Sequence, residues 1–338
     1  MPTHSSRALI LGALACLLLV CALASVTYGA RDIALADAWS ALRGHADTIN
    51  QAAAAQRLPR TALAAAVGAA LAVAGVSMQA ITRNPLADPG IFGVLSGAAL
   101  AVVVGIAFFG LRNPVPTFFT AILGSALAAV FVFVVGSLSS PGGARGGDPA
   151  PLSLALAGAA TAAAGSSLVS AVLLPRVDVM DTFRFWQIGS VGGATFEHLL
   201  LGVPFLLGGA LLCLASAGGL NALALGDDVA AGLGAHPGAT RLVAATGAVT
   251  LCGTATALAG PIGFVGLVVP HLCRLVVGSD HRWLLPTSAV AGAVLLIAAD
   301  TVGRVIARPH EIAVAVITPL LGAPLFIWIV RRQKVRDL

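Results

Sequence analysis

Charged side chains are scarce in this sequence, and the common catalytic motifs are missing from it. Only 10% of its 338 residues are Asp, Glu, Lys or Arg, whereas a soluble domain has roughly a quarter of its residues charged. The single lysine, Lys334, and the lack of a GxxxxGK[ST] loop exclude a P-loop nucleotide site. There is also no HExxH, no GxSxG and no Cys or His spacing typical of zinc, so we expect no enzyme activity, metal centre or cofactor.

Long hydrophobic stretches dominate instead. Hydrophobic residues make up 58% of the chain and recur from residue 8 to residue 330, so we expect a single polytopic membrane domain over residues 1–338. A spanning helix needs about 20 apolar residues. Ten segments approach that length and predict an all-α integral membrane protein of about ten transmembrane helices: 8–29, 58–80, 90–109, 116–137, 151–175, 198–216, 240–260, 262–277, 284–306 and 312–330.

Two of these ten segments have an alternative. The first could be a signal peptide, but its 22 uncharged residues exceed the usual apolar region of about 7–15 residues, so we expect a retained span. The seventh and eighth are divided only by Gly260-Pro261, and without that break they would form one long kinked helix.

Basic residues bear on the orientation. The tail at 331–336 contains four cations and predicts a cytoplasmic C terminus; with ten spans the N terminus with Arg7 lies there too. Counted over all loops, this topology places ten basic residues inside and nine outside. Either the orientation is reversed, or the outer face is rich in arginine for a reason such as docking an acidic protein.

Ionisable groups deep in a membrane usually bind a driving ion or proton. Asp300 is the one carboxylate well inside a predicted span, and Arg304 follows one turn later. This spacing favours an i,i+4 ion pair that stabilises the helix end. A stand-alone ion-coupled transporter therefore remains the alternative, with little support.

Small residues at Gly68, Ala72 and Gly75 predict close helix packing inside the bundle.

Three groups of residues share a specific order and spacing. They are Arg57, Arg60, Gly68, Gly75, Gln79, Asn84-Pro85-Leu86-Ala87, Gly93 and Gly97; Leu220-Asn221, Leu225-Gly226, Ala230, Leu233-Gly234 and Arg241; and Gly263–Pro270, His271, Arg274, Asp280, Asp300, Arg304 and Gly322. In this pattern the chain resembles a known family, the permeases of iron-siderophore and vitamin B12 importers. The resemblance covers most of the chain after residue 56, whereas 1–56 and 102–180 match in hydropathy alone.

The resemblance implies the rest of the assembly. It implies a ten-helix permease of a type II ATP-binding-cassette importer in the cell inner membrane. Such a permease pairs with itself or a paralogue, two cytoplasmic ATPase subunits and an extracytoplasmic substrate-binding protein. ATP hydrolysis is then expected on the separate ATPase, and the expected cargo is an iron(III)-siderophore, with cobalamin, haem and other chelates left open.

The same resemblance assigns site residues. Arg57, Arg60 and Arg304 match arginines that meet carboxylates on the binding protein, a role that suits planar guanidinium groups. Residues 217–239 match the cytoplasmic coupling loop that seats in the ATPase; the expected contacts are Leu220, Asn221, Leu225, Gly226, Asp227, Ala230, Leu233 and Gly234.

Proline turns are expected where the second and eighth spans reach the cytoplasm. Proline fixes φ and biases the preceding residue away from helix. The sequence therefore predicts rigid turns at Asn84-Pro85 and Pro270-His271. With Gln79 these turns are candidates for the inner gate; the alternative is that they only end the two helices. We expect His271 to be a hydrogen-bonded structural residue and not an iron ligand.

Overall fold

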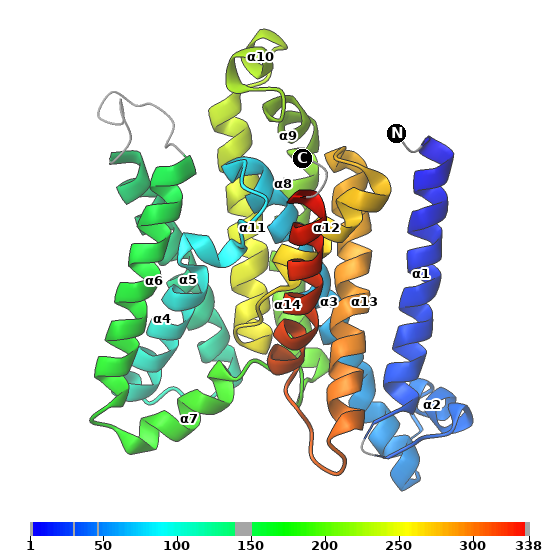
Figure 1. Ribbon diagram of the computed structural model, residues 1–338. Helices are drawn as coiled ribbons and strands as arrows, with labels where there is room; N and C mark the ends of the chain where they lie inside the picture. Colours follow the sequence, from blue (N-terminus) through cyan, green and yellow to red (C-terminus); the bar gives the residue numbers. More distant parts are fainter. Residues whose placement is uncertain (1–2, 30, 46, 139–150, 335–338) are drawn as a thin grey trace.

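The computed structural model describes residues 3–29, 31–45, 47–138 and 151–334, and its regular elements in this part of the chain are all helices. Seven are long and apolar enough to cross a membrane, and three shorter apolar helices lie among them (Figure 1). The long helices are α1 (His4–Thr27), α3 (Ile49–Thr82), α5 (Pro114–Leu138), α6 (Pro151–Leu173), α8 (Phe196–Ala215), α11 (Pro237–Ala259) and α13 (His281–Ile306). The shorter apolar segments are α4 (Val94–Phe109), α12 (Val265–Val277) and the part Val314–Ile327 of α14 (Val314–Lys334). Each predicted segment corresponds to one of these helices, which confirms the fold class.

Short helices fill the connections. α2 (Leu35–Leu42) and α7 (Val177–Gln187) were not expected, whereas α9 (Ala217–Leu223) and α10 (Asp227–Gly232) lie within the loop expected at residues 217–239. A 3-10 turn, η1 (Pro89–Phe92), precedes α4. α11 ends at Ala259, where Gly260 adopts φ 72°, and α12 begins at Val265. The seventh and eighth predicted spans are therefore separate helices.

Helix α3 forms the centre of the bundle. It packs against α13, α11, α12, α2, α8 and α1, and 78% of its most apolar window is buried, compared with 11% for α1. Its 34 residues measure about 51 Å, well beyond a hydrocarbon core of about 30 Å. The helix begins nine residues before the predicted span because Thr48 and Gln51 form a capping box ahead of an alanine-rich stretch.

Glycines set the closest helix contacts. A Cβ added at Gly68 of α3 would collide with the carbonyl oxygen of Gly292 in α13, and one added at Gly75 would collide with that of Gly266 in α12. Lipid is as apolar as leucine, so helices associate in membranes through such close backbone approach. The predicted small-residue face of α3 is thus confirmed as the contact between α3 and two neighbouring helices.

The bundle has two distinct ends (Figure 1). The start of α1, the end of α14 and the α9–α10 segment lie at one end, which we call the loop end. Helices α2 and α7, the first turns of α3 and the last turn of α13 lie at the opposite end, which we call the arginine end. Residues 335–338 of the basic tail lie outside the described residues.

Candidate functional site

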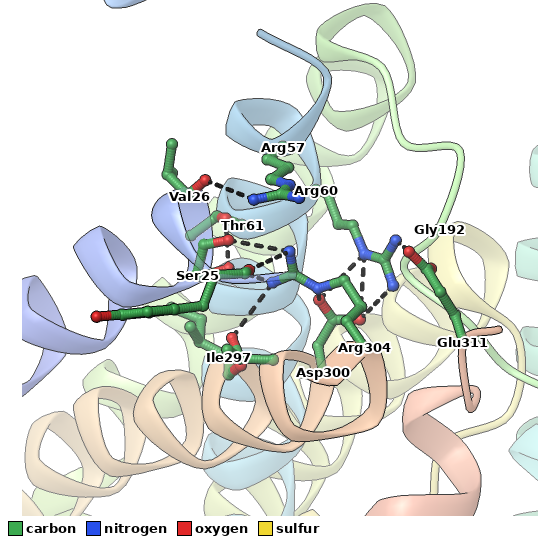
Figure 2. Close-up of polar contacts among 12 residues, drawn as sticks. Ser25, Val26, Arg57, Arg60, Thr61, Gly192, Ile297, Asp300, Arg304 and Glu311 are labelled. Atoms are coloured by element: carbon green, nitrogen blue, oxygen red, sulfur yellow. Dashed lines mark hydrogen bonds and ion pairs between the residues drawn. The ribbon is translucent and has the colours of Figure 1, made fainter. Parts of the chain in front are cut away.

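At the arginine end, Arg60 and Arg304 share one buried carboxylate. Asp300 of α13 is 1% exposed, and it accepts hydrogen bonds from Nε and Nη2 of Arg60, at distances of 3.0 and 2.8 Å. Nε of Arg304 lies 3.0 Å from Oδ2 of Asp300, the oxygen that also accepts from Nε of Arg60, which confirms the predicted i,i+4 ion pair. Figure 2 shows Arg60 reaching Asp300 from α3 while Arg304 reaches it along α13.

Arg57 and Arg304 also hold the end of α1. Nη1 of Arg57 donates to the carbonyls of Val26 and Thr27 at 3.0 and 3.1 Å, while Nη1 of Arg304 donates to the carbonyl of Ser25 at 2.9 Å. Helices leave their last four carbonyls without an internal partner. The two guanidinium groups satisfy several of these carbonyls at the end of α1 and thereby tie α1 to α3 and α13.

The structure therefore brings Arg57, Arg60 and Arg304, the arginine cluster, into one place. Arg60 retains 13% side-chain exposure, whereas Arg304 retains 1%. The cluster borders a cavity of 570 Å³ whose lining includes Glu311. Glu311 was missed by the sequence analysis, because it lies 251 positions from Arg60 and no local pattern links the two.

At the loop end, a second polar network joins α9 to the start of α13. The Asn221 amide donates to Asp280 at 2.7 Å, and its oxygen accepts from the backbone N–H of His281 at 2.9 Å. Arg7 of α1 pairs with the same Asp280 at 3.4 Å. Burial alone would raise the pKa of Asp280, but hydrogen bonds from Asn221 and the Arg282 backbone, with the charge of Arg7, lower it below its ordinary value.

Asp227 holds α10 in place. Nη2 of Arg241 in α11 donates to both Asp227 oxygens at 2.8 Å, and Arg83 at the end of α3 donates to the same carboxylate. Gly226 and Gly234 adopt φ 109° and 82° on either side of α10, a backbone region that favours glycine. The two ion pairs explain the aspartate at position 227, and the positive φ angles explain the glycines at positions 226 and 234.

The remaining loop residues divide by burial. Leu220 and Ala230 are 1% and 0% exposed and pack against α3 and α11, whereas Leu225 and Leu233 are 63% and 67% exposed. Val229, half exposed, lies between these two along the chain. Figure 1 shows α10 beyond the ends of the other helices. A group of exposed apolar side chains outside a membrane is typical of a protein–protein contact, whereas single ones are common on any surface.

The predicted turn at Pro270-His271 is wrong. Pro270 lies inside α12, which runs through to Val277. Proline lacks an N–H and leaves the carbonyl four residues earlier, that of Gly266, without its helical partner. The side-chain amide of Gln79 donates to this carbonyl at 3.2 Å, and Arg274 donates to the oxygen of the same amide. Gln79 thus replaces the missing hydrogen bond, and α12 continues.

The other gate candidates have simpler surroundings. Asn84 and Pro85 form the predicted turn after α3, in which the Asn84 side chain accepts from the backbone N–H of Leu86 at 2.9 Å. His271 is buried and meets Phe326 of α14 edge to face, with ring centroids 5.7 Å apart. One cavity of 610 Å³ is lined by Gln79, Pro85, His271 and Arg274, and also by Leu220 of α9.

Comparison with known proteins places this architecture in a family. The model of the FecCD transport family matches residues 17–332. The chain is 40% identical to the probable siderophore transport system permease protein YfiZ of Bacillus subtilis, over 97% of both chains. It is 39% identical to the ferric enterobactin transport system permease protein FepD of Escherichia coli, over 97% of this chain and 96% of that one.

A solved structure agrees with the sequence relatives. It is an inward-facing metal-chelate type ABC transporter with a TM-score of 0.82 and 32% sequence identity, and the match covers 96% of this chain and 99% of that one. The likeness thus extends over nearly the whole chain, from α1 to α14. The chain belongs to the FecCD transport family.

Proposed function

We propose that this chain is the permease subunit of an ATP-driven importer for an iron(III)-siderophore or a related metal chelate. The family match over residues 17–332 carries the proposal. The two polar networks at opposite ends of one bundle support it, because an importer must bind the substrate-binding protein on one side of the membrane and the ATPase on the other. The permease functions with a second copy or a paralogue, and both termini lie in the cytoplasm.

The loop end is the proposed contact with the ATPase. Leu225, Val229 and Leu233 offer exposed apolar side chains there, while the buried Leu220 and Ala230 fix α9 and α10 to the bundle. Asn221 and Asp227 join the same segment to α13, α11 and α3 through their hydrogen bonds and ion pairs. Movement of this segment on ATP binding would therefore reach several membrane helices at once.

The arginine end is the proposed dock for the substrate-binding protein. Arg60 and Arg57 border the cavity through which an acidic side chain would approach. Arg304 is too buried for that contact, and its proposed role is to position Asp300 and the end of α1. Substrate then crosses by alternating access along the axis between two permease copies, with Gln79, Asn84, Pro85, Pro270 and His271 near the inner gate.

Copurification tests this function. The tagged chain is expressed with the genes beside it, and mass spectrometry of the purified material identifies its partners. We expect an ATPase and a second permease copy or paralogue to copurify. Replacing Leu225 and Leu233 by Ser should remove the ATPase while leaving the permease pair.

A stand-alone ion-coupled carrier is the competing function. It would purify without an ATPase and would transport in proteoliposomes without ATP. Asp300 offers such a carrier little, because Arg60 and Arg304 already neutralise it in the structure. Transport without ATP would overturn the importer assignment.

A further inference from the structure

The cavity at the arginine end is strongly basic. Its charged lining residues are Arg31, Arg57, Arg60, Arg304 and Glu311. Four cations and one anion therefore line it, and the buried Asp300 that pairs with Arg60 and Arg304 leaves this described cluster with a net charge of +2. An unbalanced cluster of this kind attracts a further carboxylate or an equivalent anion.

Arg60 has one donor that can exchange its partner. Nε and Nη2 point to Asp300, which is 1% exposed and also paired with Arg304. Nη1 points to Glu311 at 2.7 Å, and the Glu311 side chain is 41% exposed. In Figure 2, Glu311 lies on the side of the Arg60 guanidinium opposite Arg304, close to Gly192. A partner could displace Glu311 without disturbing the buried pair.

We propose that Glu311 occupies the position of the docking carboxylate and that a carboxylate of the substrate-binding protein displaces it from Arg60. This inference rests on the proposed function and adds a regulating residue to the same site. Glu311 weakens docking because its ion pair with Arg60 must break before the new pair forms. The exchange keeps the charge around Arg60 nearly constant, so the buried Asp300 pair stays intact.

The test measures binding of the purified substrate-binding protein from the same gene cluster to the importer in lipid nanodiscs. Glu311→Gln removes the competing charge and leaves only a neutral amide oxygen as a partner for the Nη1 donor. An exposed ion pair is worth up to about 1 kcal/mol, so we expect affinity to rise about fivefold. The association rate should increase, and the effect should shrink at high salt.

Asp32→Asn is the matched control. Asp32 pairs with Arg308 at 2.6 Å in an exposed ion pair at the same end of the bundle, and it does not line the cavity. Both variants remove one negative charge from this end. Equal gains in the two variants would show a general charge effect, and a loss of affinity in Glu311→Gln would show that Glu311 helps docking; either result overturns the proposal.

Failure of this inference is distinguishable from failure of the proposed function. If the wild-type importer binds the protein and Glu311→Gln binds equally well, only the exchange is excluded. If the wild-type chain binds neither that protein nor an ATPase, the proposed function fails and the inference fails with it. Because Glu311 is exposed, the melting temperature of the variant should match that of the wild type.

Discussion

Asp300 determines how the two buried guanidinium groups at the arginine end are neutralised. Its carboxylate is 1% exposed and meets both Arg60 and Arg304. Removing one partner of a buried pair leaves an uncompensated charge, which costs far more than losing an exposed pair. Replacing Asp300 alone should therefore lower the free energy of unfolding by a measurable amount.

Asp300→Asn should lower the free energy of unfolding by about 3–5 kcal/mol, because two arginines then lack their shared anion. SDS titration of the purified chain measures this value. The comparison is Asp32→Asn, which breaks the exposed pair with Arg308 and should cost at most about 1 kcal/mol. Similar losses in both variants would contradict the buried role of Asp300.

At the same scale, sequence reasoning succeeds only for near neighbours. The Asp300–Arg304 pair follows from helical spacing, since four residues bring two side chains to one face. Arg60 joins the pair from 240 positions away, and Ser25 lies 279 positions from Arg304. Such partners depend on which helices pack together, so the sequence can place an arginine at a membrane edge but not its hydrogen bonds.

Helix α12 shows how one element depends on another. Pro270 removes a backbone hydrogen bond inside the helix, and Gln79 of α3 replaces it from the side. The sequence correctly marks Pro270 as a break in hydrogen bonding. It cannot show that a distant amide satisfies the break, and the predicted turn was wrong for this reason.

A double-mutant cycle tests this compensation. Gln79→Leu leaves the Gly266 carbonyl unpaired and should cost about 1–3 kcal/mol of unfolding free energy. In a Pro270→Ala background the new backbone N–H can donate to that carbonyl, so the same change should cost less. The difference, about 0.5–3 kcal/mol for residues in one network, comes from unfolding curves of the four proteins. Strict additivity would contradict the interpretation.

The contact of α3 with α13 gives a second test between elements. Gly68→Ala places a methyl group against the Gly292 carbonyl and should lower the free energy of unfolding by about 1–3 kcal/mol. A methyl group added at Gly208 in α8 would lie in open space. Gly208→Ala should therefore raise the free energy of unfolding by up to about 1 kcal/mol through helix propensity. Thermal melting in detergent should therefore shift in opposite directions for the two variants.

For the molecule as a whole, hydropathy predicts the number and order of the ten apolar helices. It fails for α2 and α7, which are too short and too mixed in polarity to resemble spans. It also gives no reason for α3 to extend beyond the membrane, because that part depends on the Thr48 cap and alanine content. Local residues such as caps determine where a helix ends, whereas packing between distant parts of the chain determines which helices are neighbours.

Asp227→Asn tests the link between the loop end and transport. The variant weakens the ion pairs that join α10 to Arg241 and Arg83. We therefore expect the ATP hydrolysis stimulated by loaded binding protein to fall several-fold, while the ATPase still binds. Asp228→Asn is the control, since Asp228 is exposed and has no ion pair among the described residues. ATPase rates with loaded binding protein in nanodiscs distinguish the two. Equal rates in both variants would show that the Asp227 contacts do not transmit the signal.

Helix α13 is fixed to α1 at both of its ends. At one end Arg304 donates to the carbonyl of Ser25 in α1 and to that of Tyr28 just after it, and at the other end Arg7 pairs with Asp280. The two attachments, at Asp280 and Arg304, are about 36 Å apart along α13 and resist sliding or turning of α13 against α1. Spin labels on α1 and α13 should thus keep one separation throughout a transport cycle, while labels on helices without such attachments to this pair should show the larger changes.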